Sequence, residues 1–162
     1  MSTFILNTTY DLLRSEILEL KKKIKQNSSN ISVAAEFGDI SDNAEYESAK
    51  QQQDTLFTRL RHLEQYLSSV IIDEKKIEVD KVVFGTLVTL FDKEQNNEIE
   101  YNILGPVEFE LFKDLQIATY GSPIGQLLIG KKIGDTITSS LNNNTRTLTI
   151  LGIQKAFSKQ KQ

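Results

Sequence analysis

The chain has 162 residues, of which 39% are hydrophobic, and a formal net charge of -3 at pH 7. This length can bury one ordinary core, or a smaller core beside an extended element, but not two full-sized domains. The absence of cysteine excludes disulfides and thiolate metal sites, and the negative charge argues against binding duplex nucleic acid through a general basic face.

The beginning of the chain lacks the basic segment, apolar run and small-residue cleavage site of a signal peptide. No stretch approaches the roughly 18 apolar residues that a membrane span requires. We therefore expect a soluble cytoplasmic protein that makes no contact with a membrane.

Two stretches of the N-terminal half repeat seam residues in alternating steps of three and four, as a coiled coil does. The first contains Tyr10, Leu13, Ile17, Leu20 and Ile24 and continues more weakly to Ile31; the second contains Tyr46, Ala49, Gln53, Leu56, Leu60, Leu63 and Leu67. Because only a short link around Gly38 separates them, they predict two antiparallel helices, each arm reaching roughly 40 Å. The heptads alone equally fit a dimerisation or packing element.

The link between these helices is acidic. No basic residue occurs between Lys25 and Lys50, while the same stretch contains Glu36, Asp39, Asp42, Glu45 and Glu47. Asp39 and Asp42 are spaced i and i+3, which places them on one face of a helical turn. Two carboxylates at an exposed apex form a partial site for a hard divalent cation, which keeps several waters and takes only one or two protein carboxylates.

Helix capping is the alternative interpretation of these acids. Asp39 with Asp42, and Asp42 with Glu45, both approximate a capping box. Acidic side chains in a first helical turn are also favoured by the helix dipole. Capping needs only one or two acids, however, and more are gathered here.

The sequence pattern changes across residues 71–81, so we place a domain boundary there: a hairpin domain at 1–75 and a second domain at 76–162. In the second domain, β-branched and aromatic residues predict strands over 82–91, 98–104, 116–120, 135–140 and 146–153. Ser122 as N-cap and Pro123 at the first helical position begin a short helix through Leu128. The predicted fold class is α+β: a coiled-coil hairpin, then a mostly antiparallel sheet with one short helix.

Two motifs resemble the Gre family of bacterial transcript-cleavage factors, in its GreA-like form. Residues 38–53 read GDISDNAEYESAKQQQ, close to the family pattern G-D-L-x-E-N-A-E-Y followed by A-[KR]-x-x-Q. Residues 122–135 read SPIGQLLIGKKIGD, close to the pattern S-P-[IL]-x-x-x-L-[IL]-G-K-x-x-G-D. Both motifs occur in the right order, and the resemblance covers nearly the whole chain.

The resemblance implies a second domain with an FKBP-like fold that docks on bacterial RNA polymerase at the rim of the secondary channel. The polymerase-binding residues would be Ser122, Pro123 and Ile124. The hairpin would enter the channel and reach the nascent RNA 3′ end of a backtracked complex. The protein would act as a monomer.

The same resemblance assigns the tip. Asp39 and Asp42 would be the catalytic and metal-binding carboxylates, which support Mg²⁺ shared with the polymerase active site and orient a water. The tip itself would be shaped by Gly38, Asn43, Glu45 and Tyr46. The chain would not be an enzyme, because it would stimulate the polymerase's own nuclease, and it would bind no Mg²⁺ stably in isolation.

The chain departs from the family pattern at several positions. Asp42 stands where the family usually has Glu, one methylene longer, and catalytic geometry is sensitive to displacements of about 1 Å. The usual basic residues near the tip are absent, which leaves Lys50, Arg59 and Arg61 on the second arm. Residues 26–30 are poor helix formers, which favours a looser shaft.

These departures keep a second hypothesis open, a channel-binding regulator or inhibitor of polymerase that does not stimulate cleavage. A third is an FKBP-like prolyl isomerase or chaperone. That activity would not require an acidic hairpin, and the chain has no Trp to form the floor of a proline pocket.

Overall fold

The computed structural model describes residues 3–36, 44–141 and 143–157. The chain divides into two compact units, Tyr10–Ser68 and Met1–Thr9 with Ser69–Gln162. Within the described residues, no helix is both long and apolar enough to cross a membrane.

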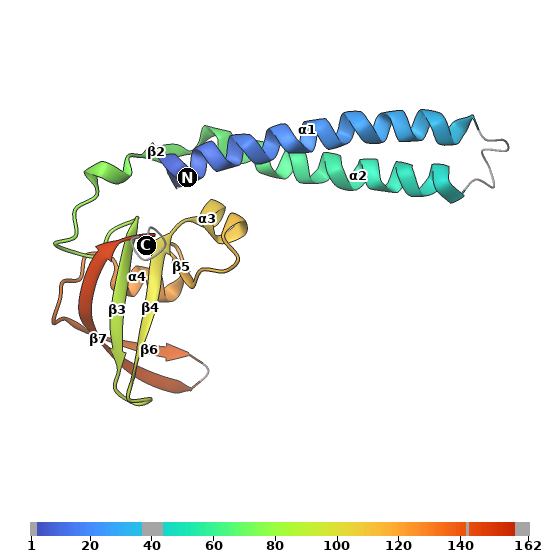
Figure 1. The fold of residues 1–162 in the computed structure, drawn as a ribbon. Coiled ribbons are helices and arrows are strands. Elements are labelled where there is room, and N and C mark those ends of the chain that lie inside the picture. The colour runs from blue at the N-terminus through green and yellow to red at the C-terminus, as the bar shows by residue number, and fades with distance from the viewer. Residues whose placement is uncertain (1–2, 37–43, 142, 158–162) are drawn as a thin grey trace. The chain divides into compact units, whose positions relative to one another are not determined.

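The unit Tyr10–Ser68 is a helical hairpin (Figure 1). It contains most of α1 (Asn7–Ala35), all of α2 (Ala44–Glu64) and the 3-10 helix η2 (Gln65–Ser68). The predicted seam is buried at Leu13, Ile17, Leu20, Leu56, Leu60 and Leu63.

Contacts between the two arms run in opposite chain directions. The Tyr10 hydroxyl donates to the Leu67 carbonyl (3.4 Å), whereas Asn27 contacts Ala49 and Gln53. Early residues of α1 therefore face the segment after α2, and later residues of α1 face the first half of α2. The predicted antiparallel hairpin is confirmed.

Helix α1 continues without interruption through residues 26–30, despite their low helix propensity. Asn27, within this segment, is only 8% exposed. Its amide and the Ser28 hydroxyl hydrogen-bond to groups on α2. These contacts offset the poor propensity, as tertiary packing commonly does.

The beginning of the chain belongs with the sheet unit. The strand β1 (Phe4–Leu6) pairs in parallel with β2 (Val70–Ile72), and the 3-10 helix η3 (Glu74–Lys76) follows. The compact units thus group residues 1–9 and 69–75 with the sheet, although the sequence pattern placed the boundary at residue 75. Strands of three residues are too short to show a periodicity, which is why the sequence did not reveal this pair.

A five-stranded sheet forms most of this unit, in the order β5-β4-β3-β7-β6. The strands are β3 (Thr86–Asp92), β4 (Asn97–Leu104), β5 (Ile117–Thr119), β6 (Thr136–Leu141) and β7 (Asn144–Lys155). Every neighbouring pair is antiparallel except β4 and β5, which run parallel. The mostly antiparallel sheet and each of its strands were predicted. β3 begins later than expected because Gly85 has φ of 93°, which extended strands do not adopt.

Two short helices accompany the sheet, α3 (Pro106–Leu111) and α4 (Pro123–Leu128). Only α4 was predicted, so the expectation of one helix was wrong. α3 has six residues, too few to show a helical period. The apolar core of the unit joins all five strands of the sheet to α4 and contains Val82, Val88, Leu90, Ile103, Ala118, Leu128, Ile137, Leu148, Ile150 and Ile153. The α+β class is confirmed.

Candidate functional site

The acidic segment between the helices lies partly outside the described residues. Gly38, Asp39, Asp42 and Asn43 are among those that the structure does not describe. On the far side of the segment, α2 begins at Ala44 and carries two acidic side chains in its first turn, Glu45 and Glu47, both exposed. Negative charge at this position is favoured by the helix dipole.

Tyr46 is the first seam residue of α2 and is half-buried. The ammonium of Lys50, one helical turn later, lies 5.3 Å from the centre of the Tyr46 ring, within the range of a cation–π contact. Lys50 is also the first basic residue after the acidic segment. Tyr46 therefore lies where the seam of α2 begins. Its role at the tip stays a prediction.

In the described ranges, no group of three or more histidine, aspartate or glutamate side chains comes together to hold a metal ion.

The second motif is mostly explained by the local structure of α4. The Ser122 hydroxyl accepts a hydrogen bond from the Gly125 amide (3.1 Å) and donates one to the Thr119 carbonyl (2.7 Å). A Cβ at Gly125 would lie 2.1 Å from the Thr119 carbonyl oxygen, so this position requires glycine. Leu128 is fully buried in the core.

The remaining motif residues shape the connection from α4 to β6. Gly130 and Gly134 have φ of 85° and 93°, values that glycine adopts without strain. The Gly130 amide donates to the Val82 carbonyl (2.8 Å), and the Asp135 carboxylate accepts from the Lys132 amide (2.8 Å). Most residues of this motif therefore have a structural role in this unit.

The predicted polymerase-binding residues differ in how much surface they offer. Pro123 is exposed, whereas Ile124 is half-buried and packs against the core. Ser122 already uses its hydroxyl in the cap of α4. Leu127, one turn after Pro123 on the same helix, is 39% exposed. The exposed side chains of α4 are therefore Pro123, Gln126 and Leu127.

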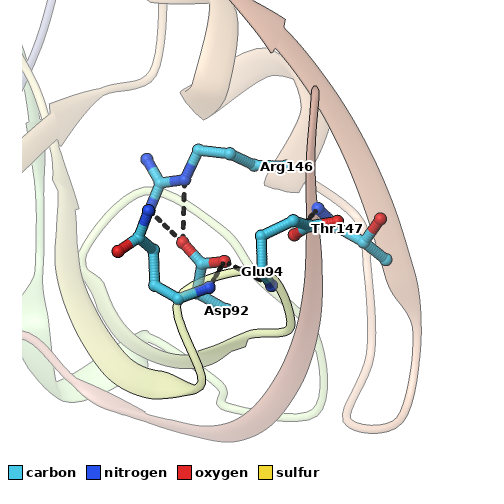
Figure 2. A network of polar contacts seen from close by, with 5 residues as sticks. Asp92, Glu94, Arg146 and Thr147 are labelled. Carbon is cyan, nitrogen blue, oxygen red and sulfur yellow. Dashed lines mark hydrogen bonds and ion pairs between the residues drawn. The ribbon is translucent and has the colours of Figure 1, made fainter. Parts of the chain in front are cut away.

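A charged cluster at the end of β3 is a second candidate (Figure 2). The Arg146 guanidinium donates to one oxygen of the buried Asp92 carboxylate from Nε (2.8 Å) and from Nη2 (2.7 Å). The backbone amides of Glu94 and Gln95 donate to its other oxygen (3.1 Å each). Glu94 in turn accepts from the Thr147 amide (2.8 Å).

These contacts tie the turn after β3 to β7. Burial opposes the charged form of Asp92, but hydrogen bonds from the Gln95 amide, Arg146 and the Glu94 amide outweigh it, so the pKa of Asp92 lies below its ordinary value. Both carboxylate oxygens are occupied by protein donors. The cluster is a structural ion pair.

Glu108 is a fully buried acid that the sequence analysis missed. Its carboxylate accepts from the Leu6 amide (3.1 Å), just before α1, and from the Gly105 amide (3.0 Å), at the start of α3. Burial raises the pKa of Glu108, although these backbone hydrogen bonds work in the opposite direction. Its signal in the sequence was a Glu three residues after Gly105, with Pro106 between them, a pattern typical of a helix start.

Both units of the chain match known protein families. Residues 4–72 match the family "Transcription elongation factor, N-terminal", and residues 76–155 match "Transcription elongation factor, GreA/GreB, C-term". The transcription elongation factor GreA of Lachnoclostridium phytofermentans is 36% identical over 146 residues, which are 89% of this chain and 90% of that protein. The chain belongs to the GreA/GreB family of transcription elongation factors.

Membership of the GreA/GreB family confirms the resemblance found in the two motifs. A further member, the transcription elongation factor GreA of Caldanaerobacter subterraneus subsp. tengcongensis, is 37% identical over 152 residues, covering 91% of this chain and 96% of that protein. Among solved structures, the GreA factor homolog 1 (Gfh1) protein of Thermus thermophilus aligns with 95% of this chain and 99% of its own, at 21% identity and a TM-score of 0.46.

Proposed function

We propose that this elongation factor binds bacterial RNA polymerase and stimulates the polymerase's own cleavage of the RNA 3′ end in backtracked complexes. The observation that supports the proposal is an antiparallel hairpin, in a GreA/GreB family member, whose two helices are joined by a segment with Asp39 and Asp42. The chain itself would be no enzyme, since it contributes side chains to a reaction that the polymerase carries out.

The hairpin has the length to present these acids inside a channel. Helix α1 contains 29 residues. At about 1.5 Å per residue, such a helix extends roughly 40 Å. Leu13, Ile17 and Leu20 of α1 and Leu56, Leu60 and Leu63 of α2 are buried in the seam, so the acids would be carried on a packed helix pair.

The tip acids have suitable chemistry for Mg²⁺. Carboxylate oxygens are hard donors, and a Mg²⁺ site commonly takes only one or two of them. When bound in the polymerase, the ion lowers the pKa of a coordinated water and offsets charge on the phosphate. Asp39 and Asp42 would hold this ion together with the polymerase, and a free carboxylate oxygen would accept a hydrogen bond from the attacking water. Gly38, Asn43, Glu45 and Tyr46 would keep the acids in place.

The sheet unit would supply the docking surface, at Ser122, Pro123 and Ile124. Of these, Pro123 offers the most exposed side chain, and Leu127 extends the same face of α4. Ser122 would act mainly by capping α4 and so presenting Pro123.

A cleavage assay tests the proposal. The protein is added to a backtracked polymerase complex with 3′-labelled RNA and Mg²⁺, and short 3′ fragments are followed over time. Asp39→Ala should abolish the stimulation. Glu47→Ala removes an exposed acid of the neighbouring helix turn and serves as the matched control, which should cleave like the wild type. Fragment release that survives in both Asp39→Ala and Asp42→Ala would contradict the metal role.

The shorter side chain at Asp42 favours one alternative, a polymerase regulator that does not stimulate cleavage. The same complexes separate the two functions, because such a regulator would slow nucleotide addition without releasing fragments. Asp42→Glu restores the usual family residue and should keep or raise the cleavage rate. Complete loss of cleavage in Asp42→Glu would contradict the proposed tip geometry.

A further inference from the structure

One layer of the hairpin seam is polar. The Asn27 amide donates to the Ala49 carbonyl and to the Gln53 side-chain oxygen, both at 2.8 Å. The Gln53 amide donates back to the Ile24 carbonyl (3.2 Å) and to the Ser28 hydroxyl (2.9 Å). Both donor hydrogens of each amide are thereby used across the helix pair.

This layer lies within the seam and not beside it. On α1, Asn27 continues the alternating steps between Ile24 and Ile31, and it is 8% exposed. On α2, half-buried Gln53 occupies the seam position before Leu56. Each arm therefore places an amide in an otherwise largely aliphatic stripe, and the two amides meet each other.

An aliphatic seam tolerates different alignments of its two helices, because one aliphatic contact resembles the next. A buried amide does not, because it must find its own hydrogen-bond partners. If α1 moved along α2 by one seam step, Asn27 and Gln53 would each face an aliphatic residue and lose these partners. The amide pair thus distinguishes one alignment from its neighbours.

We propose that Asn27 and Gln53 are positioning residues that fix the register of α1 against α2. Asn27 precedes the end of α1 at Ala35 by about 12 Å of helix, and Gln53 follows the start of α2 at Ala44 by a similar length. The register at this layer therefore determines where the two helices end relative to each other. Those ends are joined by the segment that contains the tip acids.

The consequence for cleavage rests on the function proposed above. A slip of one seam step displaces the two helix ends by about 5 Å along the axis. Productive catalytic geometry tolerates displacements of only about 1 Å. A hairpin with mixed registers would still dock, but only a fraction of its molecules would present the acids correctly.

The register is measured on the isolated protein. Because the chain has no cysteine, Ser15→Cys and Ser48→Cys supply two unique sites for spin labels, both exposed and on opposite arms. They are offset by about 20 Å along the hairpin, a separation that changes directly with a slip. The labelled wild type should give one narrow distance distribution.

The decisive variant is Asn27→Leu with Gln53→Leu, which replaces both amides by side chains that suit the seam. Replacing both partners of a buried polar pair avoids the cost of leaving one of them unsatisfied, so the hairpin should still fold. The distance distribution should broaden or gain components displaced by about 5 Å. A distribution as narrow as that of the wild type overturns the proposal.

The matched control is Gln26→Leu with Gln52→Leu, which also replaces one side-chain amide by leucine on each arm, one position earlier, where the side chains are exposed. This control should keep the narrow distribution. If it broadens the distribution as much as the seam variant does, the added leucines alone cause the broadening and the register role is overturned. Asn27→Leu alone keeps the two hydrogen bonds that the Gln53 amide donates to α1, so it should show an intermediate broadening.

The cleavage assay then tests the functional consequence. The seam variant should lower the maximal cleavage rate by on the order of 10-fold to 100-fold while the half-saturating concentration stays unchanged. An unchanged maximal rate together with a broadened distance distribution overturns the positioning role. If the wild type itself does not stimulate cleavage, the proposed function fails, whereas the register is still decided by the distances.

Discussion

The two units of this chain use their family motifs in different ways. In the sheet unit, the motif that begins at Ser122 is largely occupied with local structure: a cap, a close backbone approach, a core leucine and two glycines with positive φ. In the hairpin, motif residues Tyr46, Ala49 and Gln53 lie in the seam, while Glu45 is exposed.

A family motif thus contains residues that maintain the fold as well as residues that remain available to a partner. A side chain whose bonds and packing are already explained by the fold needs no partner to account for its presence. In the sheet motif, Pro123 begins α4 yet is exposed, as are Ile129 and Lys131, and Leu127 lies one turn after Pro123. Substitutions at neighbouring positions can separate structural from binding roles.

Leu128 and Leu127 are neighbours on α4 with opposite environments, one fully buried and one 39% exposed. Leu128→Ala should lower the free energy of unfolding by about 2–5 kcal/mol, because it leaves a cavity in the core. Leu127→Ala should change stability by less than about 0.5 kcal/mol. Urea denaturation measures both.

The same pair tests the docking face. Leu127→Ala should weaken binding to polymerase, which a titration with labelled protein detects, although its stability is that of the wild type. If Leu127→Ala binds as tightly as the wild type, this face of α4 is not part of the docking surface.

Gly121 and Gly125 lie on either side of Ser122, the N-cap of α4. A methyl group at Gly125 would lie 2.1 Å from the Thr119 carbonyl oxygen, whereas none of the surrounding atoms lies within 4 Å of one at Gly121. Gly125→Ala should therefore destabilise the protein by about 1–3 kcal/mol through overpacking. Gly121→Ala should be nearly neutral. Equal melting temperatures for the two variants would contradict the close approach at Gly125.

Most elements of the fold could be predicted from the sequence because each carried a periodic or capping signal. The hairpin was visible in the heptads from Tyr10 and Tyr46, and α4 in its cap at Ser122 and Pro123. The elements that escaped prediction are short: β1 and β2 have three residues each, and α3 has six. They depend on long-range contacts, such as the bond from the Leu6 amide to Glu108.

The candidate site, too, could be predicted from the sequence only in part. Family motifs identified Asp39 and Asp42, and these assignments stay predictions because both residues lie outside the described part of the chain. The amide pair of Asn27 and Gln53 was not anticipated. Residues 26–30 suggested only poor helix propensity, because propensity treats a residue alone while the pair is defined by a contact between two helices.

Ser122 provides a prediction of smaller size. Ser122→Ala removes the cap of α4 and should lower the free energy of unfolding by about 1 kcal/mol, with a modest loss of polymerase affinity. Ser122→Thr keeps both an acceptor for the Gly125 amide and a donor for the Thr119 carbonyl, and should retain both properties, since Thr is also a favoured N-cap. A loss of affinity in Ser122→Thr at unchanged stability would show that Ser122 itself lies in the docking contact.

The smallest expected effect is a pH dependence with opposite signs at two buried acids of the sheet unit. The pKa of Glu108 is raised above its ordinary 4.5, so its contribution to stability is full below pH 4.5 and is lost as the pH rises through the folded-state value. The pKa of Asp92 is lowered from its ordinary 3.8, so its contribution is present above pH 3.8 and is lost as the pH falls through its folded-state value.

Urea denaturation across this pH range, on Glu108→Gln and Asp92→Asn, separates the two contributions. Glu108→Gln offers a single strong acceptor oxygen, as the neutral acid does, so it loses one backbone hydrogen bond relative to the carboxylate. Relative to the wild type it should nevertheless become more stable as the pH rises above 4.5. Asp92→Asn should gain relative stability only as the pH falls below 3.8. A stability difference between Glu108→Gln and the wild type that does not change with pH would show that burial does not hold this acid toward its neutral form.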